Sequence, residues 1–108
     1  MSEIKMTVDA GICGFITKVN AVGSDDYMSV KMIIESGCPN IKKLAVVING
    51  TDVDSIDAIS AAIISNKLIT KCSEFIPHPA CPVPCALVKA CEAAGGMALK
   101  KEASIKFV

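Results

Sequence analysis

The residues with the clearest chemical potential lie in one nine-residue stretch, residues 78–86, with the sequence HPACPVPCA. The stretch contains the only histidine of the chain, His78, and two cysteines, Cys81 and Cys85. Its prolines restrict the backbone between these side chains. An imidazole and two thiols at this spacing form either a set of soft metal ligands or a thiol reaction centre. The stretch therefore predicts metal or thiol chemistry.

Two further cysteines lie beside glycines, Cys13 between Gly11 and Gly14 and Cys38 after Gly37. Cys38 and Cys81 each precede a proline at a predicted helix start, where free N–H groups and the helix dipole favour a thiolate. We therefore expect the four cysteines and the histidine to converge on one metal site. The predicted ligands are Cys13, Cys38, Cys81, Cys85 and, fifth in rank, His78.

The spacing leaves the identity of the metal open. Zinc takes four tetrahedral ligands, and His-x2-Cys-x3-Cys falls within the loose range of its sites. Iron–sulfur clusters more often use Cys-x2-Cys runs, which this chain does not contain. The leading hypothesis is thus a small protein that binds zinc or an iron–sulfur cluster, and its sequence does not decide whether it is an enzyme.

Two alternatives use the same residues differently. In the first, the protein is a thiol-based redox protein in which Cys81 and Cys85 are the reactive pair, one as nucleophile and the other as resolving thiol. In the second, it is a structural or interaction module whose cysteines only pack. Cys91 belongs to an apolar stripe at helical spacing and is expected to be a core residue, because free cysteine packs like a small apolar side chain. The stripe consists of Val83, Leu87, Ala90, Cys91 and Ala94.

Strands are predicted in the N-terminal third. Residues 3–10 alternate between polar and apolar side chains, which is typical of a half-buried strand. Further strands are expected over residues 15–22 and 27–35, joined by a turn at 23–26; the third of these strands should bury Met28, Val30, Met32 and Ile34. Residues 104–108 are predicted to form a last strand that returns to the same sheet.

Helices are predicted in the rest of the chain. The apolar spacing indicates a helix from Pro39 to about Asn49. A second should follow residues 51–57 with Ile56, Ile59 and Ile63 facing inward. A short one is expected within residues 66–76, and another from about Pro82 or Pro84 to Ala94, before Gly95 and Gly96. The fold class is therefore α+β, with three N-terminal strands and a C-terminal strand forming an antiparallel sheet covered on one face by three to four helices.

Size and composition limit the partners. A chain of 108 residues suits a single domain spanning residues 1–108. With 11 basic and 11 acidic residues and no basic block, neither nucleic acid nor a membrane is an expected partner.

The N-terminus has no signal-peptide pattern, so we expect a cytoplasmic protein with reduced thiols rather than disulfides. The apolar content of 52% exceeds what a small core holds, which predicts a homo-oligomer. A redox or metal-delivery protein remains a further partner class.

Three segments, Gly11–Phe15, Ser36–Pro39 and Cys81–Cys85, support a resemblance. They are similar to segments of small cysteine-containing proteins of anaerobic prokaryotes, for which no chemistry is known. The resemblance implies an oxygen-poor cytoplasm, in which exposed thiols and iron–sulfur clusters survive. It transfers no catalytic residue to this chain.

Overall fold

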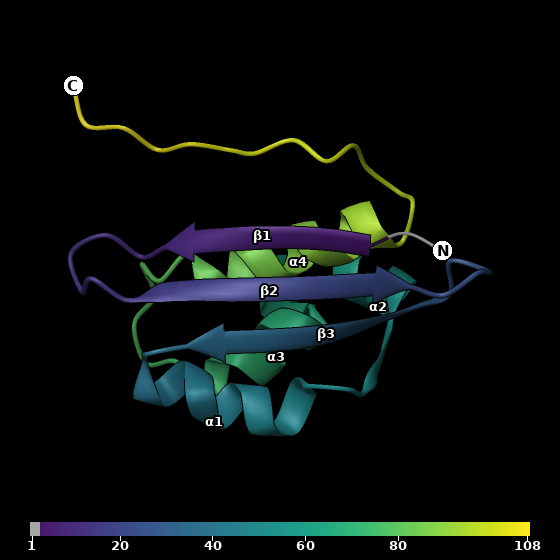
Figure 1. Ribbon diagram of the computed structural model, residues 1–108, viewed down its shortest axis with the longest axis horizontal. Coiled ribbons are helices and arrows are strands. Elements are labelled where there is room, and N and C mark those ends of the chain that lie inside the picture. Colours follow the sequence, from purple (N-terminus) through teal and green to yellow (C-terminus); the bar gives the residue numbers. More distant parts are fainter. Residues whose placement is uncertain (1–2) are drawn as a thin grey trace.

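The computed structural model describes residues 3–108, which form an antiparallel sheet with helices packed against one of its faces (Figure 1). The strands lie in the order in which they follow one another along the chain, so each strand pairs with the next. They are β1 (Glu3–Asp9), β2 (Ile16–Gly23), β3 (Ser29–Ser36) and β4 (Asp52–Asp54). The predicted α+β class is confirmed, with four strands and four α-helices within residues 3–108.

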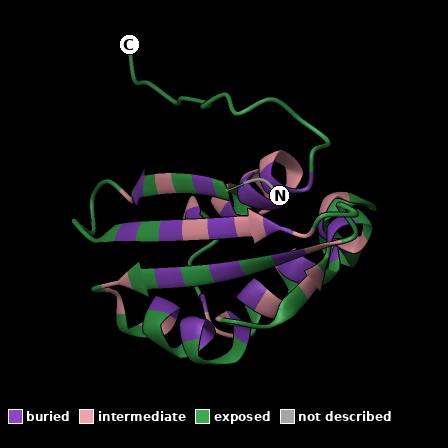
Figure 2. Ribbon diagram, turned by 45° about the vertical axis from the view of Figure 1, so that its right-hand side comes forward, coloured by how far each residue is buried: buried purple, intermediate pink, exposed green. Residues whose placement is uncertain are grey.

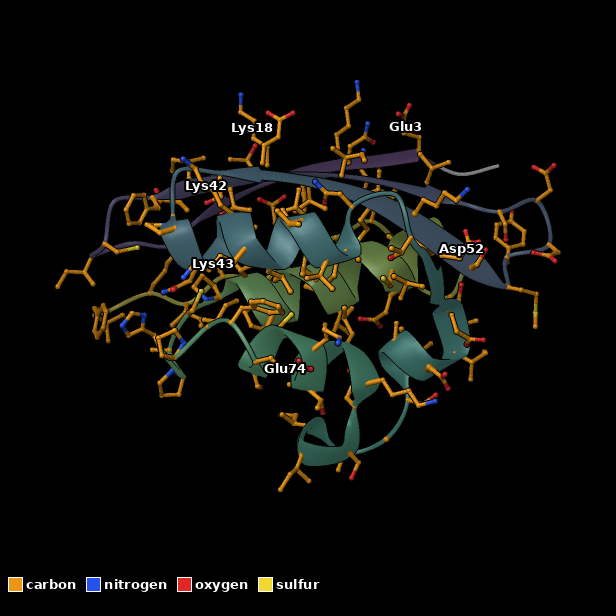
Figure 3. The ribbon with its side chains drawn as sticks, turned by 90° about the horizontal axis from the view of Figure 1, so that it is seen from below. Glu3, Lys18, Lys42, Lys43, Asp52 and Glu74 are labelled. Atoms are coloured by element: carbon orange, nitrogen blue, oxygen red, sulfur yellow. The ribbon has the colours of Figure 1, made fainter. Side chains whose placement is uncertain are left out.

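The helices cover the buried face of this sheet. They are α1 (Pro39–Ile48), α2 (Ser55–Ile59), α3 (Lys67–Ser73) and α4 (Val83–Ala94), with one 3-10 turn at Ile63–Ser65. α4 packs on β1 and β2, and α1 packs on β3. Seen from below, these helices lie under the sheet and leave its other face uncovered (Figure 3). Within residues 3–108, no helix is both long and apolar enough to cross a lipid bilayer.

The period-two pattern of the strands determines which side chains reach the core. Buried and exposed positions alternate along each long strand (Figure 2). Ile4, Val19 and Met32 point toward the helices, while Lys5, Lys18 and Lys31 point away. Successive side chains of a strand face opposite sides, so a single register buries the apolar set on all three strands. One predicted member fails, because Met28 precedes β3 and is exposed.

α4 follows its predicted stripe. Its buried residues are Val83, Leu87, Ala90, Cys91 and Ala94. The C-terminal end of this helix comes so close to β2 that a Cβ on Gly23 would overlap the carbonyl oxygen of Ala94. Glycine at position 23 is therefore a packing requirement of the contact between helix and sheet.

Asn66 holds the short elements between α1 and α4 together. Its side-chain nitrogen donates to the carbonyl oxygens of Ala58 and Ser60, both at 2.9 Å. Its side-chain oxygen accepts from the N–H of Ile69 at 2.9 Å and so caps α3. One buried amide thus joins the end of α2 to the start of α3. The presence of α3 confirms the short helix expected within residues 66–76.

Three predictions about the elements are wrong. The second helix is only five residues long and buries Ser55 and Ala58, whereas Ile56 and Ile63 are exposed. The fourth strand of the sheet is β4, which antiparallel pairing joins to β3; its last residue, Asp54, is also the N-cap of α2 and accepts from Asp57 N at 3.0 Å. Residues 104–108 form no strand and extend away from the sheet (Figure 1).

Candidate interaction surface

The predicted metal ligands do not come together. The loops that carry them lie at one end of the sheet (Figure 1), but their side chains occupy different surroundings. Cys13, Cys85 and His78 are exposed to solvent, while Cys38 and Cys81 are half-buried against the core. Across residues 3–108, no group of three or more histidine, cysteine, aspartate or glutamate side chains is placed to hold a metal ion. The hypothesis of a zinc or iron–sulfur site formed by Cys13, Cys38, Cys81, Cys85 and His78 is wrong.

The redox alternative fails for a local reason. Side chains at i and i+4 meet only if one helix contains both. α4 begins at Val83, after Cys81, so that Cys81 packs toward the core and Cys85 faces solvent. All six cysteines are free. The expected positions of both Cys-Pro pairs at helix starts are confirmed: Cys38 is the N-cap residue of α1, and Cys81 directly precedes Pro82, the N-cap residue of α4.

Two cysteines are core residues. Cys72 and Cys91 have no solvent exposure, and both belong to the main apolar cluster. The pKa of each thiol is raised to about 12, chiefly by burial, with a smaller contribution from Cys81 to the pKa of Cys72 and from Cys72 to that of Cys91. Such thiols stay protonated at neutral pH and pack as small apolar groups. The expectation for Cys91 is confirmed, while Cys72 lay in a segment whose pattern did not indicate a buried face.

The β1 edge of the sheet is open. Ala10 N donates to Phe15 O at 3.2 Å, and this bond sets the phase of the ladder between β1 and β2. Since bonded and non-bonded pairs alternate in an antiparallel ladder, Ile4, Met6 and Val8 use their backbone groups toward β2. The backbone groups of Lys5 and Thr7 point the other way, toward the edge. Such an edge can pair with another extended chain.

The uncovered face of the sheet is polar and organised in rows across the strands. Thr7, Lys18 and Glu35 form one row, and Lys5, Asn20 and Ile33 form the next. Both rows line a shallow hollow of about 400 Å³. Asn20 Oδ1 is buried there and accepts no hydrogen bond from residues 3–108. Polar atoms in this state are rare in folded proteins, so this face has an unused acceptor.

A second hollow, of about 300 Å³, lies where β1, α4 and the C-terminal segment meet. β1 contributes Ile4 and Met6 to its lining, and α4 contributes Glu92 and Ala93. The remaining wall is the stretch of residues 98–102. Beyond it, residues 103–108 are all exposed, and they run along the same side of the molecule as β1 (Figure 1).

Large apolar side chains are exposed on the helical side as well. Four apolar residues of the helical half lie off the main buried stripes: Val46, Val47, Ile64 and Val88. The first three are exposed, Val46 to 85%, whereas Val88 is half-buried against the core. Each of these side chains would gain free energy if a partner removed it from water.

The chain belongs to a family of unknown function, DUF6951, whose family model matches residues 4–107. The match includes nearly all of the exposed C-terminal segment, so that segment is part of the family's own pattern. No curated protein and no solved structure matches the chain.

Proposed function

We propose that this member of the DUF6951 family is a structural interaction module that assembles with copies of itself and whose cysteines serve only in packing. The single observation that carries the proposal is the set of large apolar side chains that the fold leaves in solvent. They occur on several separate elements: Ile12, Val46, Ile63, Ile64, Leu99, Ile105 and Phe107. Covering such residues between subunits is favourable by roughly 25 cal/mol per Å² of apolar area.

The open strand edge supports the same function. β1 presents unpaired backbone donors and acceptors along one side of the sheet, next to a hollow lined by both apolar and charged side chains. Proteins in which such an edge stays uncovered usually protect it with charges, prolines or bulges. β1 is a regular strand of seven residues without proline or bulge. Its charged side chains, Glu3, Lys5 and Asp9, lie on the open face of the sheet, so the backbone groups of the edge remain free to receive a chain.

The buried thiols fit this proposal better than any chemical role. Cys72 and Cys91 sit within the contact between α3 and α4, where their pKa values of about 12 keep them neutral. A thiol in that state is a poor nucleophile and a poor ligand. The assembly proposed here requires none of the six cysteines to react.

Multi-angle light scattering at micromolar concentration tests this proposal. An assembly gives a mass at least twice that of the 11.3 kDa chain. The buffer should contain a thiol reductant, so that any larger mass is independent of disulfides. A mass of 11.3 kDa over the micromolar range would refute the proposed self-assembly.

A further inference from the structure

The C-terminal segment has the pattern of a strand that lacks a partner. Ala103, Ile105 and Phe107 alternate with Ser104 and Lys106, so an extended backbone places the apolar side chains on one side. The segment is extended but forms no strand, and its last phenylalanine is fully exposed. From residue 99 onward, no backbone hydrogen bond to another described residue is made.

β1 has the complementary pattern. Its even-numbered residues are apolar and face the helices, and its odd-numbered residues are polar and face the open side. Met6 is only half-buried, at the rim of the hollow between β1 and α4. A further strand could pair with this edge so that its apolar side chains face the helices, as the even-numbered residues of β1 do. Those side chains would then cover Met6 and the side of α4.

The two patterns fit one another in an antiparallel pair. Residues directly opposite in such a pair share a face of the sheet. Ile105 and Phe107 then lie over Met6 and the hollow, while Lys106 lies on the face that carries the carboxylates of Glu3 and Asp9. We propose that residues 103–108 of one copy form an antiparallel fifth strand on β1 of a second copy, and reciprocally. This inference rests on the proposed self-assembly and names its surface.

The contacts at the base of the segment favour a second copy over the segment's own sheet. Met97 N and Ala98 N both donate to Glu92 O, at 2.9 and 3.2 Å. Gly96 has φ +73° and packs so closely on Tyr27 that a Cβ would lie 2.9 Å from its ring. These contacts set the direction in which the segment leaves α4, and it then runs in the same direction as β1 (Figure 1).

Within its own chain the segment could therefore add only a parallel strand. A two-fold axis perpendicular to the strands reverses the direction of the partner's segment, and the new pairs are then antiparallel like those of the rest of the sheet. One symmetric contact also completes both edges and covers both segments at once. The occupant of the β1 edge is thus the segment of a second copy.

Two substitutions test this pairing in the full-length chain. Thr7→Pro removes an N–H that points toward the open edge and leaves the ladder to β2 intact. Phe107→Lys places a charge in the covered row and changes a residue that is fully exposed in the monomer, so the fold itself is preserved. Thr70→Lys adds the same charge on the exposed side of α3, away from the proposed pairing, and is the control. We expect Thr7→Pro and Phe107→Lys each to raise the dimer dissociation constant at least about thirtyfold, and Thr70→Lys to leave it unchanged.

Amide hydrogen exchange provides the second measurement. In the dimer, the amides of Lys5 and Thr7 should exchange slowly, and in Phe107→Lys they should exchange rapidly. A dimer that survives both Thr7→Pro and Phe107→Lys would overturn this inference and leave self-assembly standing. A monomer with protected Lys5 and Thr7 amides would show that the segment folds onto its own sheet, which overturns both. A monomer in which the Lys5 and Thr7 amides exchange freely would also overturn both the strand pairing and the proposed self-assembly.

Discussion

The side-chain amide of Asn49 pairs with both backbone polar groups of Ile34, as a neighbouring strand would. Ile34 N donates to Asn49 Oδ1 at 2.8 Å, and Asn49 Nδ2 donates to Ile34 O at 3.1 Å. β4 pairs with β3 only between Ser29 and Lys31, so this half of β3 has no strand on its outer side. The C-cap residue of α1 thus completes the edge of the sheet and ties α1 to it.

Asn49→Ala should lower the free energy of unfolding by about 2–3 kcal/mol, because two half-buried backbone groups of Ile34 lose their partner. Urea unfolding followed by circular dichroism measures the change. Asn40→Ala, in the first turn of α1, is a control of the same residue type and should cost less than about 1 kcal/mol. Equal losses in the two variants would mean that the amide pairing contributes nothing to stability.

Gly23→Ala should destabilise the protein by about 3 kcal/mol or more. The added methyl group would overlap the backbone carbonyl of Ala94, which cannot move without shifting the end of α4. Gly50→Ala is the control: Gly50 has φ +78° and open space around it, so the cost there is conformational, about 1–2 kcal/mol. Thermal unfolding should rank Gly23→Ala well below Gly50→Ala, and the reverse order would contradict the close approach of α4 to β2.

Ser55→Ala should stabilise the protein by about 1 kcal/mol. The Ser55 hydroxyl is fully buried at the start of α2 and has no hydrogen-bond partner among residues 3–108. Removal of an unsatisfied polar group relieves its desolvation cost, and alanine retains the helix. Ser73→Ala serves as the comparison, since the exposed Ser73 hydroxyl donates to Ile69 O at 2.9 Å. A Ser55→Ala variant less stable than the parent would reveal a partner for that hydroxyl.

Stability should fall as the pH rises above about 9. The thiols of Cys72 and Cys91 have pKa values raised from 9.0 to about 12 in the folded protein. Between these values the unfolded chain loses protons that the folded chain keeps, so each thiol lowers the free energy of unfolding by about 1.4 kcal/mol per pH unit. This contribution is fully present below pH 9 and is lost as the pH approaches 12.

The measurement is a series of urea unfolding curves at pH 8 to 11 under reducing conditions. Cys72→Ala and Cys91→Ala should each remove part of the decrease in the free energy of unfolding with pH. The double variant should lose the whole contribution of the two thiols. Cys13→Ala, which changes an exposed thiol, is the control and should keep the full slope. If the double variant has the slope of the parent, other groups cause the alkaline loss.

The long elements of this fold could be predicted from the sequence because their patterns are local. The alternation of residues 3–10 placed Ile4 and Val8 on the buried face, and the helical spacing of Leu87 and Cys91 identified the buried stripe of α4. Pro39 and Gly95 marked a helix start and a helix end. In each case neighbouring residues carry the signal, because the period of an element is a property of its own backbone.

The tertiary structure alone decided which surfaces and side chains meet. Asp52–Asp54 is a strand only because the chain after α1 returns to β3, and its three residues have no period of their own. The segments that contain Cys13, Cys38, Cys81 and Cys85 approach one end of the sheet (Figure 1), but Cys13 and Cys85 are exposed, whereas Cys38 and Cys81 pack against the core. The alternation of residues 103–108 indicates that the segment can form a β-strand. Which strand it can pair with depends on the direction in which the chain leaves α4. Convergence of distant residues depends on long-range packing, which no local pattern encodes.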